Sequence, residues 1–348
     1  MKIGIYNPYL DSFGGGERYT LTAASHWSGK HSVDIFWDKQ DDVHVAAERF
    51  GLDLSRVKTV RNIFAKAFIL EKLWQTKMYD FILFVSDGSV PASLAKRNVI
   101  HFQVPFERVY LSVWKQSMYQ AIVVNSEFTK SNLDPTLNIP KTVIYPPVVI
   151  REKKAVNKSK IILSVGRFGG LYNTKKYDIL INTFRQMYAK GTIKDWRFIL
   201  AGSLLSSDEG DFSRLKKAAE GIPTEFFPNC TYKKLLALYD ASAIYWHAAG
   251  YSEMIPEHME HFGITTVEAM NAGCVPVSFN GGGQPEIIDN GINGYLWGTT
   301  DNLMSKTSEL ISNPKLLQGL SSGAVKKSGI FSVKRFTDSF DNLLEKLA

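Results

Sequence analysis

The chain has 348 residues, of which 45% are hydrophobic and 22% are charged, and it carries a formal net charge of +7. This length predicts two globular domains, and the longest apolar runs are far shorter than the ~20 residues that span a bilayer. Two cysteines, Cys230 and Cys274, support neither a disulfide scaffold nor a zinc site. The basic balance favours anionic partners, whereas the absence of long charge runs and of known nucleic-acid motifs argues against nucleic acid.

The N-terminus passes directly from Met1 into an apolar, strand-like segment at residues 2–6. It lacks the basic region, apolar stretch and small-residue cleavage site of a secretory signal. Together with the few cysteines, this pattern predicts a cytoplasmic protein.

Short apolar segments alternate with helix-length segments along the whole chain, which is typical of parallel sheets with helical crossovers. We expect strands at residues 3–6, 33–37, 81–85, 99–102 and 121–124 and, after a polar linker at 147–159, at 161–165, 198–201, 243–246 and 275–279. Apolar residues at helical spacing predict a closing helix after residue 331. The predicted domains are 1–148 and 149–331, and the helix at 332–348 packs on either domain, with the N-terminal one favoured.

Each half opens with a buried strand followed by a glycine-rich turn, and ligands of open parallel sheets bind beyond the carboxyl ends of strands. We therefore expect two Rossmann-like sheets that face a central cleft. In the first turn, Gly15 and Gly16 would let backbone N–H groups approach a phosphate or sugar. Tyr19 stands where a dinucleotide fingerprint needs a third glycine. A simple turn that requires positive φ is the alternative.

The second turn places cations at the end of a strand. Arg167 follows Gly166, and Lys175 and Lys176 precede the next helix. Such cations can neutralise a diphosphate and stabilise the charge of a departing leaving group. Of the two lysines we favour Lys176, because its spacing to the apolar positions of the helix sets it at the helix start, and Lys175 is held in reserve. A solvated basic surface is the alternative.

A loop with one carboxylate leads into a helix with a second one at residues 260–270. Glu260 precedes the turn at Gly263, and the N–H groups near Ile264 and Thr265 would offer positive charge to a phosphate. Glu268 lies further along the helix. A capping box between Thr265 and Glu268 would explain Glu268 structurally, but it leaves Glu260 unexplained.

Three further features bear on the site or its surroundings, and the last two leave alternatives open. A glycine turn at 281–283 is expected to close another wall of the pocket. His101 ends a strand of the first half, where it either satisfies backbone groups or reaches across the cleft. The segment 57–78 interleaves basic and apolar residues. It either rests on an anionic membrane or is a surface helix that packs its apolar residues into the core.

Taken in order, these residues resemble the retaining glycosyltransferases of family 4, which have the GT-B architecture. The resemblance covers nearly the whole chain, and its most specific element is the pair of glutamates separated by seven residues. The segments that carry it are GGGER at 14–18, IHF at 100–102, SVGRF at 164–168, EHFGITTVEAM at 260–270 and GGGQPEII at 281–288. One departure is Tyr177, where the family commonly has glycine after the lysine, so the choice between Lys175 and Lys176 stays open.

The resemblance implies a role for each site residue. Glu260 and His101 would be catalytic, and Glu268 would bind the ribose. The donor sugar would lie against Glu260, His261, Phe262 and Gly263. The diphosphate would be bound by Gly15, Gly16, Arg167, Lys176, Ile264 and Thr265.

The resemblance also implies a reaction. Family members retain anomeric configuration and work in general without a metal or other cofactor, and the wording here is closest to GDP-mannose-dependent mannosyltransferases. We therefore expect transfer of a hexose, mannose from GDP-mannose, to a saccharide or polyprenyl-linked saccharide in cell-surface glycan assembly, with peripheral contact to the inner membrane face. The alternatives are a non-catalytic nucleotide-sugar sensor and a sugar-nucleotide epimerase or phosphorylase.

Overall fold

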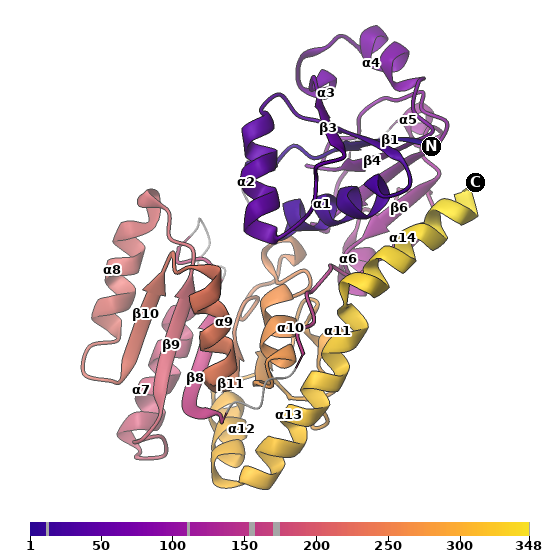
Figure 1. Ribbon diagram of the computed structural model, residues 1–348. Coiled ribbons are helices and arrows are strands. Elements are labelled where there is room, and N and C mark those ends of the chain that lie inside the picture. The colour runs from indigo at the N-terminus through magenta and orange to yellow at the C-terminus, as the bar shows by residue number, and fades with distance from the viewer. Residues whose placement is uncertain (12–13, 110–111, 153–156, 170–174, 348) are drawn as a thin grey trace. The chain divides into compact units, whose positions relative to one another are not determined.

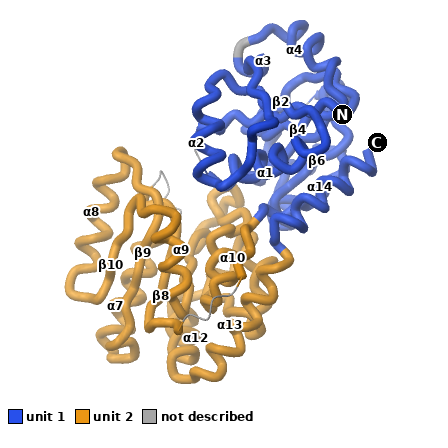
Figure 2. The backbone as a smooth tube through the Cα atoms, viewed as in Figure 1, with its two compact units in different colours: residues 1–147, 331–348 blue, residues 148–330 orange. Residues whose placement is uncertain are grey.

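The protein forms two compact units, each built around a parallel sheet (Figures 1 and 2). The computed structural model describes residues 1–11, 14–109, 112–152, 157–169 and 175–347. Unit 1 comprises residues 1–147 and 331–348, and unit 2 comprises residues 148–330. The predicted α/β class with two parallel-sheet domains is confirmed.

Unit 1 contains a seven-stranded parallel sheet in the order β3-β2-β1-β4-β5-β6-β7. The strands are β1 (Lys2–Tyr6), β2 (Ser32–Phe36), β3 (Val57–Val60), β4 (Phe81–Val85), β5 (Asn98–Phe102), β6 (Ala121–Val124) and β7 (Lys141–Val143). The helices before residue 147 are α1 (Gly15–Ser28), α2 (Gln40–Phe50), α3 (Ile63–Lys66), α4 (Ile69–Thr76), α5 (Val113–Gln116) and α6 (Glu127–Asn132). β4, β5 and β6 are buried along their whole length, as expected for central parallel strands covered on both faces.

The last helix of the chain, α14 (Val333–Leu347), belongs to unit 1 (Figure 2). Its apolar face packs on α1, where the Phe336 ring lies 4.8 Å from Tyr19 and the Phe340 ring lies 5.2 Å from Trp27, between ring centroids. All four rings are buried in one cluster with the first strands of the sheet. The core of unit 1 is therefore completed by residues from the opposite end of the sequence.

Unit 2 contains a six-stranded parallel sheet in the order β10-β9-β8-β11-β12-β13. The strands are β8 (Ser159–Val165), β9 (Arg197–Gly202), β10 (Thr224–Pro228), β11 (Ser242–His247), β12 (Val275–Phe279) and β13 (Tyr295–Trp297). The α-helices are α7 (Tyr177–Ala189), α8 (Glu209–Ala218), α9 (Tyr232–Ala241), α10 (Ile264–Asn271), α11 (Gln284–Ile287), α12 (Thr300–Ser312) and α13 (Pro314–Ser328), and three short 3₁₀ segments lie at Ser206–Asp208, Pro256–His258 and Gly329–Phe331. The strand order reverses between β8 and β11, which is the switch point where open α/β sheets bind ligands.

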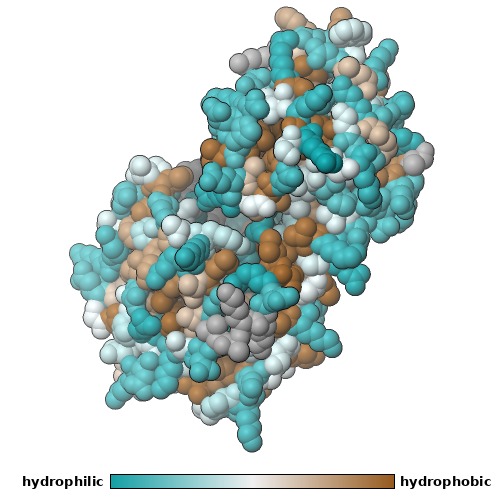
Figure 3. Space-filling model, viewed as in Figure 1, coloured by the Kyte–Doolittle hydropathy of each residue, from teal (hydrophilic) through white to brown (hydrophobic). Residues whose placement is uncertain are grey.

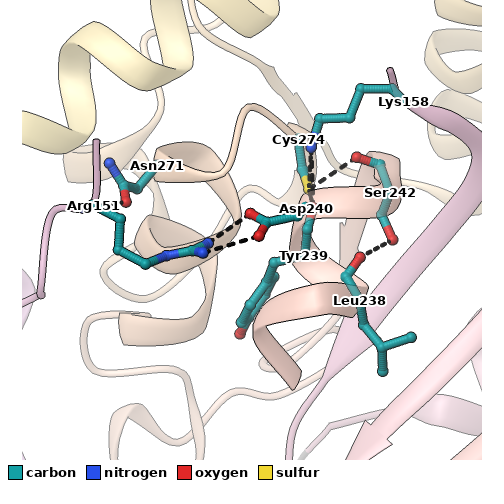
Figure 4. A network of polar contacts seen from close by, with 8 residues as sticks. All are labelled: Arg151, Lys158, Leu238, Tyr239, Asp240, Ser242, Asn271 and Cys274. Carbon is teal, nitrogen blue, oxygen red and sulfur yellow. Dashed lines mark hydrogen bonds and ion pairs between the residues drawn. The ribbon is translucent and has the colours of Figure 1, made fainter. Parts of the chain in front are cut away.

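A polar network ties the start of unit 2 to its helices (Figure 4). The Arg151 guanidinium makes two hydrogen bonds to the Asp240 carboxylate, at 2.8 and 3.0 Å, and the Arg151 N–H donates to Asn271 Oδ1. Cys274 is fully buried beside this network, and burial raises the pKa of its thiol to about 11. Of the predicted linker at 147–159, residues 153–156 lie outside the described structure, whereas Arg151 is fixed to unit 2.

Candidate active site

The carboxyl ends of β8 and β11 bring the charged residues of unit 2 together. These two strands are hydrogen-bonded neighbours at the switch point of the sheet. Gly166 and Arg167 directly follow β8, His247 ends β11, and the loop after β11 runs to Glu260 and α10. The candidate side chains of unit 2 therefore lie at the carboxyl-terminal edge of its sheet, as the sequence predicted.

Glu260 is the centre of this cluster. Its Oε2 atom accepts hydrogen bonds from Lys175 Nζ at 2.6 Å and from His247 Nε2 at 3.1 Å. Burial alone raises the pKa of the Glu260 carboxyl, but Lys175 and His247 lower it by more, so the pKa lies well below its ordinary value. Glu260 is therefore ionised at neutral pH and fixed through one oxygen, while its Oε1 atom has no partner among the described residues.

His247 is a site residue that the sequence analysis missed. Only 3% of its side chain is exposed, and burial lowers the pKa of its imidazole, with Glu260 acting in the opposite direction. A neutral ring that donates from Nε2 to Glu260 leaves Nδ1 as an acceptor, and Nδ1 has no partner in the described part of the chain. No motif marks this residue, although its place at the end of a buried strand at the switch point would have indicated it.

The two candidate lysines are directed to different carboxylates. Lys175, held in reserve above, reaches Glu260, whereas the favoured Lys176 donates to Glu253 Oε1 at 2.6 Å. Lys176 precedes α7 with φ of 51°, a left-handed conformation that glycine adopts more readily. The glycine that commonly follows the lysine in the resembled family would thus correspond to Lys176 rather than Tyr177, which is buried in the core. Helical spacing alone could not separate the two lysines.

Arg167 and Gly166 lie beside Lys175. Arg167 is exposed and has no hydrogen bond or ion pair to any described residue, so its guanidinium is available to an anion. The stem of Lys175 crosses Gly166, where a Cβ atom would come within 2.9 Å of the lysine Cδ. Glycine at this position therefore allows the lysine to reach Glu260. Residues 170–174, which include Gly170 of the predicted turn, lie outside the described structure.

The N-terminus of α10 forms another wall of the cluster. Gly263 caps the helix with φ of 117° and no side-chain cap, and the N–H groups of Ile264 and Thr265 donate to no acceptor among the described residues. Because the helix begins at Ile264, Thr265 is not the N-cap residue, and the capping box suggested for Glu268 is wrong. Instead, Tyr239 donates its hydroxyl to Glu268 Oε2 at 3.2 Å.

Thr265 is held by the sheet below it. The Tyr245 hydroxyl donates to Thr265 Oγ1 at 2.9 Å and also lies 3.3 Å from the Val165 carbonyl. Tyr245 is fully buried in β11, between β8 and β12. The first turn of α10 is therefore fixed to the carboxyl ends of two central strands.

A buried amide supports the loop that carries Glu260. Gln284 is fully buried, donates from Nε2 to the Phe262 carbonyl at 2.9 Å and accepts from Thr266 Oγ1 at 3.0 Å. The Gly283 N–H donates to the Glu260 carbonyl at 2.8 Å, and a Cβ atom on Gly282 would overlap that carbonyl. The glycine turn at 281–283 thus packs against the backbone of the Glu260 loop and positions it.

His261 and Phe262 contact protein rather than open space. His261 Nε2 donates to the Glu257 carbonyl at 3.1 Å, and burial lowers the pKa of its ring. The Phe262 side chain is buried. Of the four residues predicted around the donor sugar, Glu260 and Gly263 border the charged cluster, whereas these two side chains stabilise the loop.

The unit 1 candidates are in a different environment. α1 begins at Gly15, and the buried Glu17 carboxylate accepts from the Gly14 N–H at the start of this helix. A Cβ atom on Gly16 would overlap the side-chain amide of Gln103. Gly16 therefore allows close approach of one of the protein's own side chains.

His101 lies in the core of unit 1. It is fully buried and stacks on Tyr19, with ring centroids 4.0 Å apart, and its Nδ1 atom lies 3.2 Å from the Val123 carbonyl. Burial lowers its pKa to about 3, so the ring is neutral. The contact with the Val123 carbonyl agrees with the first of the two alternatives for His101, that it satisfies a backbone group at the end of a strand.

The described residues contain no group of three histidine, cysteine or acidic side chains arranged to hold a metal ion. None of the helices described is both long and apolar enough to cross a bilayer.

Comparison with known proteins places these features in a family context. The family model described as Glycosyl transferases group 1 matches residues 149–327. The chain is 27% identical over 248 residues to the GDP-Man:Man(3)GlcNAc(2)-PP-Dol alpha-1,2-mannosyltransferase of Xenopus laevis, covering 65% of this chain and 47% of that protein. It is 27% identical over 267 residues to the human alpha-1,3/1,6-mannosyltransferase ALG2, covering 68% and 61%. The chain thus spans about half the length of the curated relatives it matches.

Solved structures share the fold of the whole chain. Anabaena Alr3699/HepE in complex with UDP and glucose has a TM-score of 0.72 at 17% identity, covering 99% of this chain and 100% of that one. A glycosyltransferase from Rickettsia africae ESF-5 has a TM-score of 0.75 at 17% identity, covering 99% and 98%. These likenesses confirm the predicted GT-B class of fold.

Proposed function

The chain belongs to the glycosyl transferases group 1 family, and from this premise we propose that it transfers a hexosyl group from a nucleotide diphosphate sugar to a saccharide or polyprenyl-linked saccharide. Family membership confirms the predicted enzyme class. The observation that carries the proposal is the cluster of Glu260, Lys175 and His247 beside the open N-terminus of α10.

The cations and the helix start form the proposed diphosphate site. Arg167 follows the end of β8 and the stem of Lys175 crosses Gly166 there, and the free N–H groups of Ile264 and Thr265 add the positive end of α10. The negative charge of the diphosphate grows as the sugar departs, and preorganised positive groups stabilise it. Because these groups supply that charge, we propose that transfer needs no metal or other cofactor.

Glu260 is proposed to bind the donor sugar. Its Oε2 atom is committed to Lys175 and His247, whereas Oε1 can accept from a sugar hydroxyl. An ionised carboxylate at this place also favours the positive charge that develops on the anomeric carbon. We propose retention of anomeric configuration through same-face attack on a short-lived oxocarbenium-like ion pair, without a protein nucleophile.

The nucleotide and the acceptor are proposed from the site and the relatives. Glu268 lies on the same helix as Thr265, is oriented by Tyr239, and would accept from ribose hydroxyls. GDP-mannose is the proposed donor, because the name of the Xenopus relative specifies GDP-Man and a PP-Dol-linked acceptor. A polyprenyl-linked saccharide at the inner face of the membrane, in cell-surface glycan assembly, is the corresponding acceptor.

The test is release of nucleoside diphosphate from GDP-, UDP-, ADP- and dTDP-sugars in the presence of EDTA, with and without a membrane lipid extract. Selective release from GDP-mannose that the extract increases would support the donor, the acceptor class and metal independence together. Donor binding without release would identify a nucleotide-sugar sensor. Conversion of the donor without acceptor, or transfer to inorganic phosphate, would identify an epimerase or a phosphorylase.

A further inference from the structure

The basic segment 57–78 of unit 1 divides into two parts in the structure. Ile63 and Phe64 are buried in the core. Beyond them the large apolar side chains turn outward, with exposed fractions of 86% for Phe68, 77% for Leu70 and 75% for Trp74. Packing into the core therefore explains the first part of the segment and leaves the second part unexplained.

We call the exposed apolar side chains Phe68, Leu70, Trp74 and Met78 the α4 face. Leu70, Trp74 and Met78 follow one another at intervals of four residues, so they share one side of α4 and its extension. Met78 is 60% exposed, and a hollow beside it is lined by Trp74, Gln75, Lys77 and Met78. Hydrophobic side chains also reach the surface of unit 1 where α4 lies (Figure 3).

The opposite side of α4 is fixed to unit 1 by polar contacts. Thr76, the buried residue of this helix, accepts from the Leu94 N–H at 2.9 Å. Lys72 Nζ donates to the Phe64 carbonyl at 2.9 Å, and Arg61 pairs with Glu71 at 2.8 Å. The helix is therefore held by its polar side, and its apolar side is directed to solvent, which is the reverse of an ordinary surface helix.

A second exposed apolar group lies on α5, which contacts the same segment, residues 90–94, as α4 does. Val113 and Trp114 of α5 are 84% and 53% exposed. Lys115 of this helix donates to the Val90 carbonyl at 2.9 Å, and Leu94, 42% exposed, belongs to the segment that contacts α4. Both helices thus contact residues 90–94, and each presents an exposed tryptophan.

The charges around the α4 face indicate its partner. Residues 57–78 contain five basic residues and one acidic residue, Glu71, which is paired with Arg61. Lys58 and Lys77 are exposed. Tryptophan favours the interface between lipid and water, and exposed lysines in the same segment as exposed apolar side chains match an anionic bilayer. A second copy of the chain would bring like charges together, which is unfavourable.

We propose that the α4 face is a docking surface for anionic lipid bilayers. Phe68, Leu70 and Trp74 enter the boundary between headgroups and acyl chains, and the exposed lysines Lys58 and Lys77 contact the anionic headgroups. The proposal deepens the proposed function, because a polyprenyl-linked acceptor is reached at such a surface. It is tested without donor or acceptor, so its failure and the failure of the proposed function are distinguishable.

The test is co-flotation of the full chain with vesicles of phosphatidylcholine, with or without phosphatidylglycerol. The native chain is expected to float with the anionic vesicles. The double variant Leu70→Ser/Trp74→Ser should bind them at least about tenfold more weakly, because it removes apolar area from the contact. The double variant Lys58→Gln/Lys77→Gln should bind the anionic vesicles about thirtyfold more weakly, because it removes two positive charges at an anionic surface. Ile292→Ser, which alters an exposed apolar residue of unit 2, is the matched control and should bind as the native chain does.

A second readout locates the contact. Vesicles of brominated lipid quench nearby indoles, so they should quench the native fluorescence, and Trp74→Phe should reduce the quenched fraction. Nucleotide binding by each variant, measured calorimetrically with GDP and UDP, should be unchanged. Native binding that the Leu70→Ser/Trp74→Ser variant retains, or no binding to anionic vesicles, would overturn the proposal. Concentration-dependent self-association that this variant abolishes would instead assign the face to a second copy.

Discussion

The glycine turns after β1 and β8 occupy equivalent places in two similar sheets, yet they are used differently. After β8, Gly166 makes room for the stem of Lys175, and a cationic group reaches Glu260. In unit 1, Gly16 makes room for the neutral amide of Gln103. Repetition of strand, glycine turn and helix therefore predicts where the backbone allows close approach. Whether such a turn can bind an anionic ligand depends on which side chains the rest of the chain places beside it.

The carboxylates of Glu260 and Glu17 give the sharpest test of this difference. Glu260→Gln should lower nucleoside diphosphate release about a hundredfold to a thousandfold, because it removes the partner of Lys175 and the charge beside the donor sugar. Glu17→Gln, at the start of α1, should leave release unchanged and lower the free energy of unfolding by about 1 kcal/mol. Both are measured by steady-state release and urea unfolding. Full activity of the Glu260 variant would remove Glu260 from the site.

Variants of Lys175 and Lys176 test which of the two lysines belongs to the proposed diphosphate site. Lys175→Ala should reduce kcat/KM about a hundredfold, since it removes a cation from the proposed diphosphate site. Lys176→Gly should change kcat/KM less than about threefold, because glycine adopts the left-handed conformation there without strain. Kinetics with the best donor of the panel provide the measurement. The reverse ranking would restore the choice made from helical spacing.

The buried histidine of unit 1 should appear in the pH dependence of stability. His101 has a folded pKa of about 3, whereas an unfolded histidine titrates near 6.5. Between these values only the unfolded chain binds this proton, so stability falls as pH falls, by about 1.4 kcal/mol per pH unit. His101→Phe should remove this component. Urea unfolding from pH 7 to pH 4 compares the two slopes, and equal slopes would show that His101 is protonated in the folded chain.

The smallest expected effect concerns the ribose side of the site. Tyr239→Phe removes the hydroxyl that donates to Glu268, and loss of one such hydrogen bond costs about 1 kcal/mol. GDP affinity should fall about fivefold, while kcat at saturating donor stays within about twofold. Calorimetric titration of GDP measures the first quantity. An unchanged affinity for GDP would show that the Tyr239–Glu268 contact has no role in nucleotide binding.

The sequence allowed the α/β class, the strand rhythm and the clustering of Glu260 with cations to be predicted, because apolar periodicity and strand ends report on backbone position. It left open whether Lys175 or Lys176 is the diphosphate ligand, since helical spacing does not report the left-handed conformation of Lys176. The sequence placed the start of this helix directly after the turn at Gly263, and α10 begins at Ile264. Only the alternative capping box for Glu268 was wrong, because Gly263 rather than Thr265 is the N-cap residue. The side to which Leu70 and Trp74 point was also undetermined, since the same periodicity describes a core face and an exposed face.

The return of α14 to unit 1 has a consequence for synthesis on the ribosome. The rings of Tyr19 and Trp27 are covered by Phe336 and Phe340, which are translated only after the whole of residues 148–330. The nascent N-terminal segment therefore emerges with part of its apolar surface uncovered until α14 has been translated. Unit 2 is continuous in the sequence, so its residues are all available before the core of unit 1 is completed.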